Sequence, residues 1–417
     1  MMKKVMASVV LMALVSVSYA DTDLDLDAFC NSNGTFQGIV TLNNTNYLRC
    51  DLPTSIAVND TVVLARDSDL APLFPIVWAL PGIVVVGNGH LQNANPSTVD
   101  KTVLKIEPGT QIVGAVYSNS ALVITRGAQI DARGTPSDPI VFSSIDDDMA
   151  DTSEWGGLIL AGFAESNGCP RANGQDTCEM EGLATPYYYG GGRYLDETMN
   201  SGILEYVVIA EGGHEVALES EINGLTLYSV NSSTTINNVH IHNNKDDGIQ
   251  FFGGDAAVEN LWLTCNRDDS VDWEEGFQGS LSNVFIAQGD DADHAFELAS
   301  GSRIFWPGNR TARGVVTNVT VGFYGSSSGF TDVPLKLTWG TDAYFENIEI
   351  SGYTQNLCND TVLAASTNPD RIFAFNNMQY DCTRVIDNTS YMTLPASASA
   401  TGFSVASFWN APTPRCE

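Results

Sequence analysis

Between residues 236 and 302 the sequence repeats one pattern three times. Each copy has an asparagine that leads an alternating apolar segment, then an acidic turn, then a second short apolar segment. The copies begin at Asn238, Asn260 and Asn283, so the period is 22 and then 23 residues. Self-similarity at such a period indicates stacked structural units, each of which buries its apolar face against its neighbours.

The apolar segment of each copy predicts a β-strand. Val239 and Ile241 alternate with histidines, and the other copies keep the same frame, which is the period of a strand with one buried face. A leucine-rich horseshoe would need a helical segment that this repeat lacks. The sequence therefore predicts an all-β, right-handed parallel β-helix, a solenoid with coils of about 22–23 residues and capped ends.

Further along the chain, Asn318 and Asn347 also stand directly before an alternating apolar segment of the same pattern. Strands of successive coils pair about 4.8 Å apart, so we expect these asparagines to stack in a ladder at one corner of the coil. The competing interpretation is that asparagine only favours turns.

The N-terminal residues predict where the protein is located. Lys3 and Lys4 precede an apolar run over residues 5–17, and small residues follow at positions 18–20. This arrangement is typical of a secretory signal peptide, here residues 1–20, and predicts a secreted protein, periplasmic or extracellular. The run is too short to span a bilayer and no second long apolar run follows, so no transmembrane segment is expected.

Charge narrows the possible partners. The formal net charge is −31, which makes nucleic acid and anionic membrane surfaces poor partners and cations good ones. The eight cysteines fit an oxidising compartment. Short separations suggest pairing of Cys169 with Cys178, of Cys30 with Cys50 and of Cys358 with Cys382, which leaves Cys265 for Cys416.

Changes in composition and in the spacing of the apolar segments divide the chain into four parts. After the signal peptide, we expect an N-terminal cap over residues 21–75, a parallel β-helix over 76–385 and a C-terminal cap or tail over 386–417. A disulfide-bearing loop at 163–200 interrupts the coil and carries three consecutive tyrosines at 187–189. Such a loop either contacts sugar or is pinned to the wall of the coil.

Several motifs resemble a known family. These are residues 104–110 (Leu-Lys-Ile-Glu-Pro-Gly-Thr), 127–135, 155–160 (Trp-Gly-Gly-Leu-Ile-Leu) and 246–254 (Asp-Asp-Gly-Ile-Gln-Phe-Phe-Gly-Gly). As an ordered set from about residue 80 to 350 they resemble an uncharacterised family of secreted or surface bacterial parallel β-helix proteins, many of them known only as lipoproteins or hypothetical proteins. The resemblance implies a right-handed coil and secretion, and it supplies no catalytic residues. Members often carry a lipid-attachment cysteine directly after the signal peptide, whereas Cys30 lies ten residues past the expected cleavage site.

The acidic turns predict a metal site. Asp246, Asp268 and Asp290 follow one another at steps of 22 residues, and carboxylates stacked in register repel unless a cation or a shared proton intervenes. Ca²⁺ takes six to eight oxygen ligands and suits a secreted protein. The alternative is that the aspartates only cap backbone amides of the turns. The candidate calcium ligands are Asp246, Asp247, Asp268, Asp269, Asp272, Asp290, Asp291 and Asp293.

Two functions remain open. The first is a non-catalytic cell-surface or extracellular protein that binds glycan or cell-surface matrix and is stabilised by calcium. The second is a carbohydrate-active enzyme, a glycoside hydrolase or polysaccharide lyase, that uses carboxylates of the acidic face, since neighbouring coils bring such groups to the separation of a retaining pair. The signatures Gly-His-Gly and Arg-Ile-Lys of polygalacturonase-like enzymes are absent, so no catalytic residue is assigned.

The outward positions of the repeat carry histidines and aromatic rings. His240 and His242 share one strand face, where they either bind a metal or face solvent. Trp262, Phe285 and Phe252 form either an exposed stripe for carbohydrate or protein contact or a surface that another segment covers.

Overall fold

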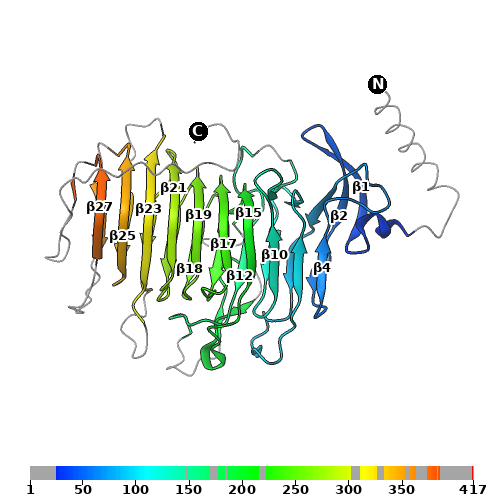
Figure 1. Cartoon of the computed structure of the whole chain (residues 1–417), viewed down its shortest axis with the longest axis horizontal. Coiled ribbons are helices and arrows are strands. Elements are labelled where there is room, and N and C mark those ends of the chain that lie inside the picture. The colour runs from blue at the N-terminus through cyan, green and yellow to red at the C-terminus, as the bar shows by residue number, and fades with distance from the viewer. Residues whose placement is uncertain are drawn as a thin grey trace.

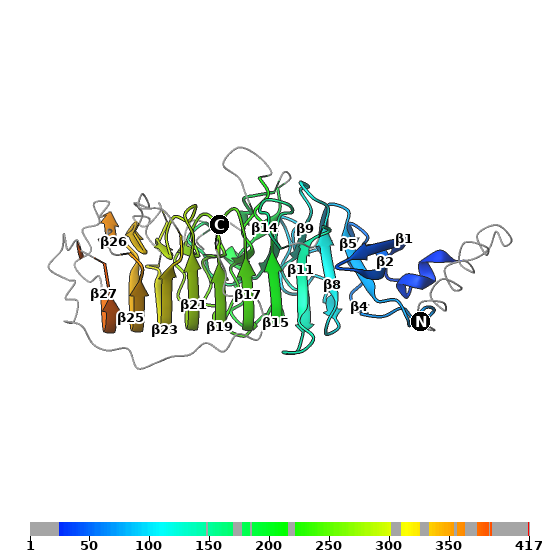
Figure 2. The same cartoon turned by 90° about the horizontal axis from the view of Figure 1, so that it is seen from above.

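The protein is a parallel β-helix. Its structure, a computed structural model, describes residues 25–146, 149–169, 177–183, 186–215, 222–301, 310–325, 333–353, 357–362, 373–382, 384–385 and 416. Strands lie side by side along the long axis of the molecule, from β1 and β2 at one end to β27 at the other, and a second layer of strands lies behind the first (Figures 1 and 2). The predicted all-β parallel β-helix is thereby confirmed.

One sheet, sheet A, contains the longest strands of the coil. Its described strands are β1 (Thr35–Leu42), β2 (Thr45–Asp51), β4 (Thr61–Leu64), β5 (Ile76–Leu80), β7 (Val103–Ile106), β8 (Gln111–Gly114), β10 (Gln129–Arg133), β11 (Ile140–Ser144), β15 (Gly202–Ala210), β17 (Thr235–His242), β19 (Ala257–Thr264), β21 (Ser280–Gln288), β23 (Arg313–Phe323), β25 (Asp342–Ser351) and β27 (Phe373–Tyr380). Apart from the antiparallel pair β1–β2, the pairing is parallel.

A second sheet, sheet B, lies on the opposite side of the coil. Its described strands are β3 (Ser55–Ile56), β6 (Ile83–Val86), β9 (Ala121–Ile124), β12 (Leu158–Ala161), β16 (Leu225–Tyr228), β18 (Ile249–Phe252), β20 (Val271–Glu274), β22 (Phe296–Leu298), β24 (Leu335–Thr338), β26 (Leu357–Val362) and β28 (Arg384–Val385). All of these pair in parallel with the next coil.

A bend divides sheet A into two faces. The first half of β15 pairs with β10, whereas its second half pairs with β11. Between the halves Tyr206 takes a left-handed conformation, and in later coils an asparagine takes it, as at Asn260 with φ of 53°. Asparagine tolerates this conformation better than most residues do. Each coil therefore has three strand segments, two in sheet A and one in sheet B.

The asparagines of the bend form the predicted ladder from Asn260 onward. Each side-chain amide donates to the side-chain oxygen of the asparagine one coil before, as Asn283 does to Asn260 at 3.0 Å. The same contact recurs from Asn318 to Asn283 and from Asn347 to Asn318, each at 3.0 Å. At the start, Asn260 donates to Asn237 rather than to Asn238. The ladder fixes the register of successive coils.

The core fills the interior of the coil. Inward side chains of both sheets are almost fully buried, among them Trp78, Trp155, Trp273, Phe251 and Phe296. Burial of such large apolar surfaces is the main favourable term in folding. Outward positions carry many polar groups, but on part of sheet B they carry apolar side chains that form a second, smaller cluster, among them Val123, Ile159 and Phe252.

The N-terminal end joins the coil directly. The hairpin β1–β2 lies over its edge, and β2 already pairs in parallel with β5. β3 and β4 likewise pair in parallel with β6 and β7, so part of the range 21–75 belongs to the first coil. The expected signal peptide and the range 386–415 lie outside the described residues. Within the described part of the chain, no helix is long and apolar enough to cross a membrane.

Disulfide bonds join three of the expected cysteine pairs. They are Cys30–Cys50, Cys169–Cys178 and Cys265–Cys416. Cys382 is also disulfide-bonded, and the side chain of Cys358, its expected partner, lies outside the described ones. Such bonds persist in oxidising compartments.

Candidate functional site

An acidic corner runs along the coil where sheet A turns into sheet B, over turns 243–248, 265–270 and 289–295. Its carboxylates accept hydrogen bonds from the next coil. The backbone N–H of Asp269 donates to Asp247 at 3.0 Å, and that of His294 donates to Asp269 at 2.8 Å. Asp247 and Asp269 are 5% and 4% exposed, so these two aspartates do cap turn amides, as the simpler interpretation of the turns expected.

Five of the eight predicted calcium ligands lie in two adjoining groups. Oxygens of Asp246, Asp247 and Asp268 lie within 4.8 Å of one another, as do those of Asp268, Asp269 and Asp293. Carboxylate groups of this kind are the ligands that Ca²⁺ prefers.

The third repeat departs from the spacing that the sequence suggested. Asp293 donates its backbone N–H to Asp268 at 3.0 Å, so Asp293 and His294 stand opposite Asp268 and Asp269. Asp290 and Asp291 do not, and Asp291 instead lies 3.8 Å from Arg267. The equal step of 22 residues from Asp268 to Asp290 is therefore a coincidence of spacing, because extra residues enter this turn.

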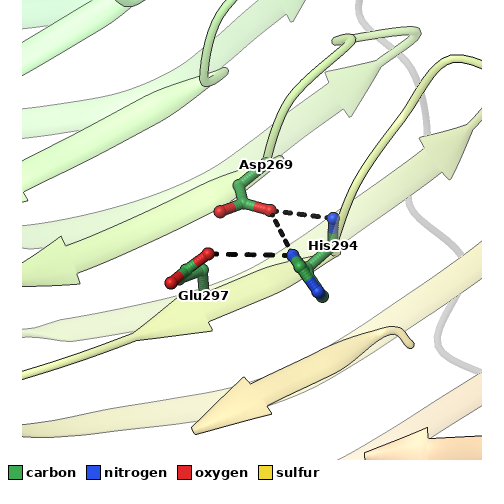
Figure 3. A group of neighbouring side chains, drawn as sticks. All are labelled: Asp269, His294 and Glu297. Atoms are coloured by element: carbon green, nitrogen blue, oxygen red, sulfur yellow. Dashed lines mark hydrogen bonds and ion pairs between the residues drawn. The ribbon is translucent and has the colours of Figure 1, made fainter. Parts of the chain in front are cut away.

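His294 lies among carboxylates at the end of the corner (Figure 3). Its Nδ1 is 2.9 Å from Asp269, 3.2 Å from Asp293 and 3.8 Å from Glu297. The ring is 6% exposed, so the group of Asp269, His294 and Glu297 is a second arrangement that could hold a metal ion.

The corner continues onto the outer face of sheet B. Gln250, Asp272, Glu297 and Lys336 occupy one row across β18, β20, β22 and β24. Gln250 donates to Asp272 at 2.8 Å, and Lys336 lies 2.6 Å from Glu297. Burial, followed by Asp269 and Glu297, raises the pKa of Asp272 well above its usual range. Asp272 is the remaining member of the predicted calcium set, and it belongs to this row.

A cavity of about 580 Å³ lies at the other end of β20, beneath the disulfide-bearing loop. The loop contributes the disulfide Cys169–Cys178 and the short pair of strands β13 (Cys178–Glu179) and β14 (Tyr188–Tyr189). The chemically active groups that line the cavity are Glu179, Glu181, Tyr188, Tyr189, Glu274 and Glu275. The lining of this cavity is mainly polar, and convergent polar groups are what fix the orientation of a ligand in a binding site.

Aromatic packing fixes the loop on the coil. The ring of Tyr189 lies 4.5 Å from that of Tyr228, which stacks on Phe252 at 4.5 Å. Phe252 is consequently 2% exposed, so the loop covers this outward ring rather than leaving it free. Trp262 is also buried, at 8% exposure.

The carboxyl groups of the cavity differ in environment. Glu275 accepts hydrogen bonds from the hydroxyls of Tyr189, at 2.7 Å, and of Ser166. Glu181 is an exposed residue at the edge of the cavity, where desolvation by the surrounding atoms, and then the charge of Glu275, raises its pKa to about 7. Burial followed by Asp272 and Glu275 raises the pKa of Glu274. The cavity thus holds a carboxyl group with a raised pKa beside one that accepts hydrogen bonds from two hydroxyls, an arrangement suited to acid–base catalysis.

The paired histidines make local hydrogen bonds. His240 Nε2 and His242 Nδ1 lie 2.8 and 2.7 Å from the hydroxyl of Thr264. Burial, and then His242, lowers the pKa of His240 to about 3. His240 is therefore a neutral, buried residue and does not face solvent.

The sequence did not single out the cavity residues as a site. Glu181 and Tyr189 lie in a loop without periodicity, and Tyr189 meets Glu275 across 86 residues of sequence. The available signals were the tyrosine triplet and the adjacent acids Glu274 and Glu275, neither of which specifies the other.

Comparison with known proteins places the chain in a family. A family model described as a pectate-lyase-like β-helix domain matches residues 90–407. Among solved structures, the crystal structure of pectate lyase Pel9A is similar, with a TM-score of 0.39 and 12% sequence identity over 89% of this chain and 85% of that chain. That likeness is too distant to carry an argument, and no curated protein matches the sequence. Since the family model covers more than half of the chain, this protein belongs to the pectate-lyase-like β-helix domain family.

Proposed function

We propose that this protein is a secreted carbohydrate-active enzyme that binds a polysaccharide in the cavity beneath the disulfide-bearing loop and hydrolyses its glycosidic bonds there. One observation carries the proposal: Glu181 lines the same cavity as Glu275 and Tyr188, and its pKa is raised to about 7. The family and the disulfide bonds support the carbohydrate and extracellular parts of the proposal.

Glu181 would act as the general acid. In its protonated form it donates a proton to the glycosidic oxygen as the bond to the sugar carbon breaks, which lets the leaving chain depart as an alcohol. Tyr189 and Ser166 donate hydrogen bonds to Glu275, which favour its anionic form, and in that form it would stabilise the positive charge that develops on the sugar ring. Water supplies the hydroxyl of the new reducing end, and its remaining proton restores the acid.

Charge selects the class of polysaccharide. The chain carries a net charge of −31, and Asp272, Glu274 and Glu297 lie along the sheet face that leads to the cavity. A polyuronate would be repelled there unless cations bridged the two. We therefore propose a neutral polysaccharide, with the partly exposed ring of Tyr188 as a stacking surface.

Calcium at the acidic corner remains part of the proposal. Its support is the closeness of oxygens from Asp246, Asp247 and Asp268, and from Asp269 and Asp293. Burial, and then repulsion by neighbouring carboxylates, raises the pKa of Asp247 and Asp269; a cation there would offset that repulsion and would stiffen the coil. That corner also supports the non-catalytic alternative, in which the same face only binds glycan and calcium.

The test is turnover and binding measured on one panel of neutral polysaccharides. We expect reducing ends to appear with the wild type and turnover to fall about 10²–10⁴-fold in Glu181→Gln, with binding retained. Wild-type activity should decline as the pH rises through about 7, because Glu181 then loses its proton. Glu259→Gln, an exposed change on β19, is the matched control. Binding without cleavage would favour the non-catalytic alternative, and full turnover by Glu181→Gln would refute the assigned acid.

A further inference from the structure

A separate group of carboxylates lies on the same edge of the coil, toward the N-terminus from the acidic corner. Asp146 lies two residues past the end of β11, Glu154 precedes β12, and Glu211 directly follows β15. One oxygen from each lies within 4.8 Å of the other two. None of the three contacts the cavity, and the proposed reaction uses none of them.

Two of these carboxylates are buried completely. Glu154 and Glu211 are 0% exposed, whereas Asp146 is exposed. Within the described residues neither side-chain oxygen of Glu154 makes a hydrogen bond of normal geometry, although the side chains of Ser144 and Asp146 lie close to it. A buried carboxylate without a partner costs several kcal/mol, so the arrangement of Glu154 calls for a positive partner or a proton.

Hydrogen bonds hold the backbone of Glu154 and the side chain of Glu211 in place. The N–H of Glu154 donates to the carbonyl of Glu211 at 2.9 Å, and the N–H of Ser153 donates to Gly212 at 2.9 Å. The N–H of Ser144 donates to Oε2 of Glu211 at 3.1 Å. These contacts join the two turns that bring the side chains of Glu154 and Glu211 close to Asp146.

The atoms of this group that could bind a metal ion are oxygens. Besides the three carboxylates, the hydroxyl of Ser144 lies against Asp146, to which it donates a hydrogen bond. The oxygens of the three carboxylates lie within 4.8 Å of one another, so a single proton would leave the other two charges in contact. Hard divalent cations are the partners that such oxygens select.

We propose that Asp146, Glu154 and Glu211 bind a divalent cation, with Ca²⁺ as the expected ion, at a site distinct from the acidic corner. The ion would tie the turn after β11 to the turn after β15 and so join two successive coils. Asp146 is the exposed member of the group, so the ion would enter from its side.

Trp155 offers a direct readout. It follows Glu154 in sequence, and its indole N–H donates to the carbonyl of Ala210, the residue before Glu211, at 2.7 Å. A Tb³⁺ ion bound by the three carboxylates would therefore lie near this indole and emit when tryptophan is excited. We would titrate the full chain with Tb³⁺ and then displace it with Ca²⁺, using Asp146→Asn, Glu154→Gln, Trp155→Phe and Asp269→Asn.

The expected results assign the ion to one site. Asp146→Asn and Glu154→Gln should weaken Tb³⁺ and Ca²⁺ binding about tenfold or more, since each removes one charged ligand. Trp155→Phe should lose most of the sensitised emission while calorimetry shows unchanged Ca²⁺ affinity. Asp269→Asn, which alters the acidic corner, should leave the Trp155-dependent emission as in the wild type.

Two results would overturn the site. One is that both Asp146→Asn and Glu154→Gln bind Tb³⁺ and Ca²⁺ with the same affinity as the wild type. The other is emission that survives in Trp155→Phe and disappears in Asp269→Asn, which would place the ion at the acidic corner. If the buried change Glu154→Gln fails to fold, the exposed change Asp146→Asn decides the question alone. Polysaccharide turnover plays no part in the readout, so failure of the proposed function leaves this test intact.

Discussion

Replacement of Asn283 tests whether the asparagine ladder stabilises the coil. Its amide donates to Asn260 and its oxygen accepts from Asn318, both at 3.0 Å. Two such hydrogen bonds contribute about 1–3 kcal/mol together. Alanine at a left-handed φ, 58° here, adds strain of about 1–2 kcal/mol. We therefore expect Asn283→Ala to lower the free energy of unfolding by about 2–5 kcal/mol.

Glycine separates the two contributions. Asn283→Gly loses the same hydrogen bonds but adopts the left-handed conformation without strain, at an entropy cost of about 0.5–1 kcal/mol. The glycine variant should thus be more stable than the alanine variant by about 0.5–1 kcal/mol. Asn46→Ala is the control, because Asn46 is an exposed residue of the hairpin that accepts from Thr41.

Equilibrium unfolding in urea, followed by circular dichroism, measures these differences. The comparison is valid if the free energy of unfolding of all three variants falls with urea concentration at the same slope as that of the wild type. This slope reports the surface that is exposed on unfolding. Two outcomes would refute the reasoning: a loss under about 0.5 kcal/mol for both Asn283 variants, the range of ordinary surface changes, or an alanine variant at least as stable as the glycine variant.

Three further predictions concern charge and cross-linking. Burial raises the pKa of Asp272 in the folded protein. The contribution of this group to the stability of the fold is therefore fully present below a pH of about 4 and is lost as the pH rises. The loss is about 1.4 kcal/mol for each unit by which the pKa of the folded protein exceeds that of the unfolded chain. In chelator at pH 7, Asp272→Asn should therefore melt above the wild type, with the gain vanishing near pH 4; a lower melting temperature at pH 7 would contradict this. The pKa of His240 is lowered to about 3, so wild-type stability should fall as the pH drops below about 6.5, by up to about 1.4 kcal/mol per pH unit. His240→Gln should flatten that slope, and an unchanged slope would exclude His240 as its cause. The double change Cys169→Ser, Cys178→Ser opens a loop of sequence separation 9 and should cost about 2.6 kcal/mol; glycan binding should weaken, and binding equal to that of the wild type would show that the loop does not form the cavity.

Periodicity explains what the sequence predicted of the fold. Inward Val239, Leu261 and Val284 recur in one frame because each coil must present the same face to the core. Asn260 and Asn283 mark the bend because one residue type satisfies both its conformation and its hydrogen bonds. These features are local to one coil and repeat in the next, so a single sequence reveals them.

Features without a repeat were beyond that reasoning. Glu181 and Glu275 meet only because the loop folds back across the coil, and no local pattern encodes that contact. Glu154 and Glu211 come from different coils and from positions that the later repeats fill with other residues. The acidic corner was found as a region, yet the extra residues before Asp293 shifted its register, which the spacing of aspartates alone could not reveal.

The bond between Cys265 and Cys416 implies an order of events in time. Cys30–Cys50 and Cys169–Cys178 span sequence separations of 20 and 9, whereas Cys265–Cys416 spans 151. The first two can close as soon as the neighbouring chain has been made, but the third must wait for everything between its ends. A chain that is cut short before Cys416 would hold the early bonds and keep a free thiol at Cys265. That thiol would mark unfinished molecules for any factor that recognises unpaired cysteines.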